Sequence, residues 1–170
     1  RLSDFQTRHP EITLLLNPAG RFIELKPGGV DVAIRYVRYD RMTDPVDTLL
    51  DLDLLIVGRP ELLRAPETLN ARDLLHRPWL QELGTSESST WLIAHGVTGA
   101  RVGNLMHLPG NLMLDALRGG QGIAITARIW VENDIKDGRL ISLFENARDA
   151  GYHLVYPHGD LRPSVRNLLT

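Results

Sequence analysis

Short apolar runs alternate along the chain with polar stretches rich in Gly, Pro, Asn and Asp. Runs of roughly four to eight apolar or β-branched residues between such turn formers are typical of strands. They occur at 11–16, 31–36, 52–57, 78–83, 101–107, 122–126, 139–144 and 152–156. Helices are predicted at 1–9, 21–26, 71–75, 91–95, 110–118, 128–136 and 164–169. This alternation indicates an α/β fold, and the unit 11–36 predicts a parallel sheet with right-handed crossovers.

Local signals set the expected helix ends. Asn70 can cap the helix 71–75, with Asp73 three residues on, and Ser89 or Thr90 is the expected cap of 91–95 after a polar loop. The helix 110–118 should bury one face, because four apolar residues share i, i+4 spacing. These are Leu112, Met113, Ala116 and Leu117.

Composition is that of an ordinary globular protein, with 170 residues, 43% apolar residues and a formal net charge of -2. Such a balance gives no electrostatic reason for these residues to contact DNA. The absence of cysteine excludes disulfides, thiolate metal sites and a cysteine nucleophile. No apolar run approaches the roughly 18 residues of a membrane span, and residues 1–5 lack a signal-peptide core.

Motifs of catalysis do not emerge from the sequence. The six histidines show no metal-ligand spacing. The segment 84–88 differs from a nucleophile elbow at its last position, which is Ser instead of Gly, and 120–122 lies between a helix and a strand, the wrong order for a dinucleotide fingerprint. We therefore expect no enzyme, no metal and no cofactor.

Ligands of open parallel sheets lie beyond the carboxyl ends of strands, where helix N-termini favour anions. Three segments are predicted to lie there: Asn17, Pro18, Ala19 and Gly20; Tyr36, Val37 and Arg38; and His107, Leu108 and Pro109. Asn17 could equally be an ordinary turn residue. Arg38 could bind a carboxylate or be solvated or ion-paired, whereas His107 could donate to an anion. The three tryptophans are expected to pack, although Trp79 beside Glu82 could border the cleft.

A series of segments, in order, resembles the effector-binding domain of LysR-type transcriptional regulators, and within that family most closely the glycine-cleavage-activator subgroup. They are 29–36 (GVDVAIRY), 49–50, 60–63 (PELL), 118–124 (RGGQGIA), 137–140 (DGRL) and 152–157 (YHLVYP).

This resemblance implies a type 2 periplasmic-binding-protein-like fold, in which two Rossmann-like lobes are joined by two crossover strands near 52–57 and 153–156. Residues 1–52 and 157–170 would form lobe I, and 53–156 lobe II. The family's first strand and its DNA-binding winged helix-turn-helix would lie before Arg1. The turn with Gln121 would join the other predicted segments in lining the cleft.

The function implied is that of a cytoplasmic effector sensor. It would bind a small, anionic metabolite between its lobes, form a homodimer or tetramer, and contact DNA only through the absent N-terminal domain. The expected dimer contacts, which could equally face the chain's own core, are Leu2, Phe5, Ile12 and Leu14 against Leu112, Met113 and Leu117. A solute-binding protein of transport is the alternative within the same fold, and a small α/β enzyme is a second one.

Overall fold

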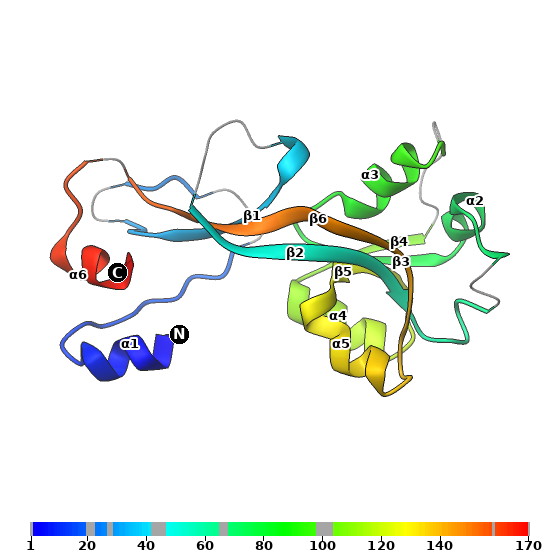
Figure 1. Cartoon of the computed structure of the whole chain (residues 1–170), viewed down its shortest axis with the longest axis horizontal. Coiled ribbons are helices and arrows are strands. Elements are labelled where there is room, and N and C mark those ends of the chain that lie inside the picture. The colour runs from blue at the N-terminus through cyan, green and yellow to red at the C-terminus, as the bar shows by residue number, and fades with distance from the viewer. Residues whose placement is uncertain are drawn as a thin grey trace.

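The computed structural model describes residues 2–19, 23–26, 29–41, 47–64, 68–97, 104–157 and 159–169, with no side chains described at 41 and 145–149. Within this part of the chain, six strands form one mixed sheet in the order β1-β6-β2-β5-β3-β4. Figure 1 shows helices and short strands gathered at both ends of the molecule, with two long strands running between them. We call the end that holds α1, β1 and α6 the first lobe, and the end that holds α2–α5 and β3–β5 the second lobe.

The two long strands are β2 (Asp47–Gly58) and β6 (Ile141–Val155), which pair antiparallel. The prediction of two separate strands, 139–144 and 152–156, is wrong, because β6 is one strand. Its backbone pairs with β2 on both sides of a register shift at 147–149, and such pairing does not depend on the side-chain pattern. Phe144, at a φ of 47°, is the extra residue of a β-bulge between Leu143 and Glu145.

The first lobe contains α1 (Leu2–Arg8), β1 (Ala33–Arg38), the 3-10 turn η1 (Tyr39–Arg41) and α6 (Pro163–Leu169). β1 pairs antiparallel with β6. The parallel sheet expected here is therefore wrong. The predicted strand 11–16 and the described part of the helix 21–26 have no regular structure, because no described strand pairs with this segment and Leu15 and Leu16 are exposed.

The second lobe contains the three parallel strands β3 (Pro78–Glu82), β4 (Asn104–Leu108) and β5 (Ile123–Ala127). β5 also joins β2 in antiparallel pairing. The helices are α2 (Ala71–Leu75), α3 (Glu87–Ala94), α4 (Gly110–Arg118) and α5 (Arg128–Lys136). Strand is followed by helix three times, so the carboxyl ends of β3, β4 and β5 lie at one edge of the sheet beside the N-termini of α3, α4 and α5.

Each face of the second-lobe sheet has its own core, because alternate residues of a strand point to opposite faces. One core packs Leu55, Val57 and Leu80 against α4 and α5, and the other packs Ile56 and Trp79 against α2 and α3. Trp79 is fully buried and donates its indole N–H to the Leu74 carbonyl at 2.8 Å, which confirms it as a packing residue.

The helix signals were confirmed in part. Asn70 caps α2 through the amides of Arg72 and Asp73, and the Asp73 carboxylate accepts from the Asn70 amide in return. α4 buries Met113, Ala116 and Leu117 as predicted, but Leu112 is exposed. α3 begins at Glu87, four residues before the expected start.

Candidate functional site

Two adjoining pockets lie beside the carboxyl ends of β3 and β5, and residues from both lobes line them. Glu87, Leu54 and Ile125 line both pockets and form the partition between them. The first, which we call the Trp91 pocket, is lined by Arg38, Leu54, Leu55, Ile56, Glu87, Thr90, Trp91, Ala94, His95, Ile125 and Phe144. The second, which we call the aromatic pocket, is lined by Tyr36, Leu52, Leu54, Glu82, Thr85, Glu87, Ile125, Thr126, Ala127, Trp130 and Tyr152.

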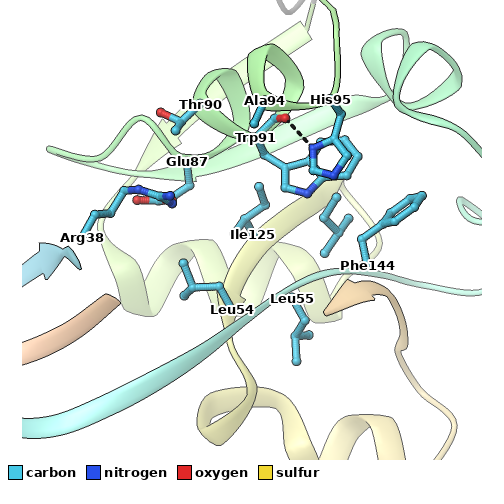
Figure 2. Close-up of a pocket in the computed structure, with 11 residues that line it drawn as sticks. Arg38, Leu54, Leu55, Glu87, Thr90, Trp91, Ala94, His95, Ile125 and Phe144 are labelled. Carbon is cyan, nitrogen blue, oxygen red and sulfur yellow. Dashed lines mark hydrogen bonds and ion pairs between the residues drawn. The ribbon is translucent and has the colours of Figure 1, made fainter. Parts of the chain in front are cut away.

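A buried ion pair joins the lobes at the partition. Arg38 on β1 donates to Glu87 Oε2 at 2.7 Å, and the Tyr36 hydroxyl donates to Glu87 Oε1 at 2.8 Å. Glu87 is 7% exposed, and Arg38 also contacts Asp40 at 3.1 Å. Figure 2 shows Arg38 reaching from β1 toward Glu87 on α3. The two lobes are thus linked by an ion pair as well as by the strands that run between them.

Proton affinities at the partition are strongly perturbed. Burial raises the pKa of Tyr36 far above its ordinary value, and the charge and hydrogen bond of Glu87 raise it further. Burial lowers the pKa of Arg38, but its hydrogen bonds to Asp40 and Glu87 outweigh this effect and leave the pKa raised. Tyr36 therefore stays neutral and Arg38 stays charged throughout the physiological pH range.

The Trp91 pocket lies between α3 and the crossing strands. The rings of Trp91 and His95 stack at 3.9 Å between centroids, and His95 Nδ1 lies 2.8 Å from the Trp91 carbonyl oxygen. Phe144 packs on Trp91 from the bulge in β6, at 5.1 Å between centroids. This pocket is mostly apolar, and its charged groups, Arg38 and Glu87, neutralise each other.

The aromatic pocket is walled by three rings and a carboxylate. Tyr152 on β6 makes edge contacts with Tyr36 on β1 at 6.1 Å and with Trp130 on α5 at 6.5 Å. Burial raises the pKa of Tyr152, and the negative charge of Glu82 raises it further, whereas a hydrogen bond with Trp130 lowers it. Burial also raises the pKa of Glu82, which ends β3 at the partly exposed mouth. The pocket is small and open to solvent, with a cavity volume of about 30 Å³.

The buried residue Gln81 fixes the loop that carries Glu87 into the site. Its side-chain N–H donates to the Thr85 carbonyl at 2.8 Å, and its oxygen accepts from the backbone amide of Ser88 at 3.2 Å and from the Ser88 hydroxyl. These bonds hold the segment 85–88 where it leads into α3, which explains why the helix begins at Glu87. Polar composition had suggested only a loop there.

The predicted site residues fall in three places. Tyr36 lines the aromatic pocket and Arg38 the Trp91 pocket, while Val37, between them on β1, lines neither. Asn17, Pro18 and Ala19 are exposed on the first lobe and line neither pocket, and Gly20 lies outside the described residues. The residues His107, Leu108 and Pro109 line neither pocket, although Leu108 pairs with Glu82.

Gln121 lies at the amino end of β5, whereas the aromatic pocket lies at the carboxyl end of that strand. Several pocket residues were missed by the sequence reasoning: Glu82, Thr85, Glu87, Trp130 and Tyr152. Applying the strand-end rule to β3 and β5 would have found Glu82 and Trp130, because they lie where each strand meets the next loop or helix.

The described residues contain no group of three or more His, Asp or Glu side chains that could hold a metal ion. None of their helices is long and apolar enough to cross a membrane.

Known proteins similar to this chain are transcriptional activators. It is 29% identical over 168 residues to the AhcY transcriptional activator HvrB of Rhodobacter capsulatus, covering 98% of this chain and 57% of that protein. It is 24% identical over 156 residues to the HTH-type transcriptional activator AmpR of Citrobacter koseri, covering 92% and 54%. The chain thus spans about half the length of these relatives.

Solved structures agree on the fold. The effector domain of the transcriptional regulator AmpR of Pseudomonas aeruginosa superimposes with a TM-score of 0.70 at 24% identity, covering 99% of this chain and 83% of that one. The regulatory domain of AphB of Vibrio vulnificus gives 0.69 at 21% identity, covering 99% and 86%. The predicted fold class is confirmed. The likeness to the glycine-cleavage-activator subgroup stays a prediction. Residues 1–170 match the family described as LysR substrate binding domain, and the chain belongs to that family.

Proposed function

We propose that this domain senses a small-molecule effector bound between its lobes and passes the signal to a DNA-binding domain elsewhere in the same protein. The observation that carries this proposal is the pair of adjoining pockets lined from both lobes, with Tyr36 and Arg38 on one side and Glu87 and Trp130 on the other. A ligand held by both sides binds one lobe arrangement better than another, and it shifts the equilibrium by that difference in affinity.

Several finer predictions belong to this proposal: the residue boundaries of the lobes (1–52 with 157–170, and 53–156), a dimeric or tetrameric state, a cytoplasmic location and a role in binding instead of catalysis. The raised pKa of Tyr36 and Tyr152 keeps both phenols protonated near neutral pH, so neither is available there as a general base. Of the expected dimer contacts, Phe5, Met113 and Leu117 are buried within the chain, while Leu2 and Leu112 are exposed and available. The names of the relatives favour a regulator over a transport protein.

Thermal unfolding of the chain with amino acids, keto acids, aromatic acids and amines tests the proposal. A ligand at 100 times its dissociation constant adds roughly 2.7 kcal/mol to the free energy of unfolding, a shift of several degrees. We expect Tyr152→Ala to remove the shift and Gln121→Ala, at the far end of β5, to keep it. If no compound stabilises the folded protein, or if Tyr152→Ala leaves the shift intact, the cleft is not the effector site.

A further inference from the structure

We propose that the ligand of the aromatic pocket carries an organic cation, an amine or quaternary ammonium group, which lies between the Glu82 carboxylate and the rings of Tyr36, Tyr152 and Trp130. This inference rests on the proposed effector site and names the chemistry of its ligand. It departs from the anionic metabolite that the sequence suggested.

The charges lining the aromatic pocket are negative. Its ionisable acids are Glu82 and Glu87, and none of its described lining residues is Lys, Arg or His. Arg38 neutralises Glu87 from the Trp91 pocket, at 2.7 Å. For Glu82 no basic group of the described residues lies within ion-pair distance. Among the described residues, the Glu82 carboxylate therefore has no basic partner, and a cationic ligand could take that place.

The rings supply the second half of a cation site. Tyr152 contacts Tyr36 and Trp130 edge-on, at interplanar angles of 66° and 67°, and all three rings line the same pocket. Aromatic faces attract ammonium groups, most strongly Trp, and grouped rings recognise quaternary ammonium ligands. Both phenols remain neutral because burial raises their pKa, so they offer a cation uncharged aromatic rings.

Helix N-termini commonly attract anions, but two of the three at this edge, those of α3 and α4, are already faced by the chain's own carboxylates. Glu87 lies in the first turn of α3. Glu82 lies against the first residue of α4, because a Cβ added to Gly110 would come within 2.7 Å of Glu82 Oε1. An anionic ligand entering here would be repelled by the Glu82 carboxylate. A cation would instead stabilise the ionised form of Glu82 and offset the desolvation that raises its pKa.

Three indole N–H resonances make a direct test, since the chain has three tryptophans. The 170-residue chain would be titrated with tetramethylammonium and phenethylamine as cationic probes, phenylethanol as a neutral analogue and phenylacetate as an anionic one, while 15N spectra follow the Trp130 indole, assigned with Trp130→Phe. We expect both cations to shift Trp130 saturably, and the neutral and anionic analogues to bind at least tenfold more weakly.

Glu82→Gln should weaken the cations at least tenfold while the other two indole resonances stay in place, showing an intact fold. Glu132→Gln, an exposed glutamate on the same helix as Trp130, is the matched control and should change nothing. If phenylacetate or phenylethanol shifts Trp130 as well as the cations do, or if Glu82→Gln leaves cation binding unchanged, the cation inference is wrong and the effector site stands. If probes of every charge leave Trp130 unmoved, the inference and the proposed effector site both fail.

Discussion

At the scale of single residues, the molecule places two carboxylates in opposite situations a few residues apart. Glu87 is buried, and it accepts hydrogen bonds from Tyr36 and Arg38. Glu82 is exposed and has no basic partner among the described residues, although desolvation raises its pKa. The first arrangement stabilises the contact between lobes, and the second costs some stability whenever Glu82 is ionised.

Removing the charge of Glu87 should expose how strongly the two lobes are coupled. Glu87→Gln leaves Arg38, whose side chain is 17% exposed, with Asp40 as its remaining acidic partner among the described residues. We expect a cost of about 1–3 kcal/mol in the free energy of unfolding. Urea unfolding of Glu87→Gln, Arg38→Met and the double variant measures it. The double variant should lose less than the sum of the single ones, by about 1 kcal/mol.

An exposed pair serves as the control for this cycle. Glu24→Gln, which removes the partner of Lys26 at the surface, should change the free energy of unfolding by less than about 0.5 kcal/mol. Strict additivity of Glu87→Gln and Arg38→Met would contradict the buried coupling.

Glu82→Gln should change the pH dependence of stability. The pKa of Glu82 is raised in the folded protein above 4.5, so the unfolded chain ionises first as the pH rises, and the native protein loses stability from about that pH upward. Relative to the wild type, Glu82→Gln should therefore gain stability between pH 4 and pH 7, by less than about 1 kcal/mol because the side chain is partly exposed.

The exposed carboxyl of Glu61 provides a control of opposite sign. A hydrogen bond to its own backbone and one from Arg59 lower its pKa, so the wild type gains stability as Glu61 ionises. Thermal melts across pH 3–8 measure both effects. As the pH rises, Glu82→Gln should become more stable than the wild type and Glu61→Gln less stable. A pH-independent effect of Glu82→Gln would show that desolvation does not disfavour the ionised carboxyl of Glu82.

At the scale of elements, local signals predicted well wherever the reason for the element was local. The cap at Asn70, the opening of α4 after Pro109 and the bounds of α5 all came from neighbouring residues. Elements set by distant partners were missed. β6 depends on β2, the start of α3 depends on Gln81, and the apolar segment 11–16 has no described strand to pair with.

The residues of the site also differ in whether local sequence predicts them. Tyr36 and Arg38 follow from a strand that is visible in the sequence. Glu87 and Tyr152 do not, since Tyr152 reaches the pocket only because β6 pairs with β1 and places it opposite Tyr36. No spacing along the chain records that register, which is why the sequence could suggest a cleft but not its chemistry.

Asn70→Ala should show that α2 depends on its cap. The variant loses two hydrogen bonds to the Asn70 side chain and leaves Asp73 with a single arm of the capping box, so we expect a loss of about 1 kcal/mol. Ser86→Ala is the matched comparison, because Ser86 precedes α3 without a side-chain cap bond, and should cost clearly less. Chemical denaturation followed by circular dichroism compares the two, and equal costs would reject the assigned role of Asn70.

At the scale of the whole molecule, apolar burial is uneven. The two large cores belong to the second lobe and the adjoining half of β2, whereas a third, smaller one lies midway, at Leu52, Leu54, Ala127 and Ala150. In the first lobe, Phe5 and Val165 are buried but belong to none of these clusters. The pairing of β2 with β6 also shifts register at three places, between Thr48 and Leu50, between Leu52 and Leu54 and between Leu55 and Ile56.

This asymmetry predicts the order in which backbone amides exchange with solvent. Amides of β3 and β5, buried between two cores, should be the most protected, and those of β1, an edge strand with no residue buried in any of the three cores, should exchange much faster. Hydrogen exchange followed by mass spectrometry on the folded chain measures this directly. Equal protection of β1 and β5 would mean that the lobes open as one unit.

The pairing of β1 with the end of β6 also bears on how the protein is made. Tyr36 comes early in synthesis and Tyr152 late, yet they form one wall of the aromatic pocket. Closing so long a loop is entropically costly and slow, whereas the parallel strands of the second lobe are contiguous in the chain. A nascent chain emerging from the ribosome can therefore assemble the second lobe first, and it acquires its ligand pocket only when translation has passed β6.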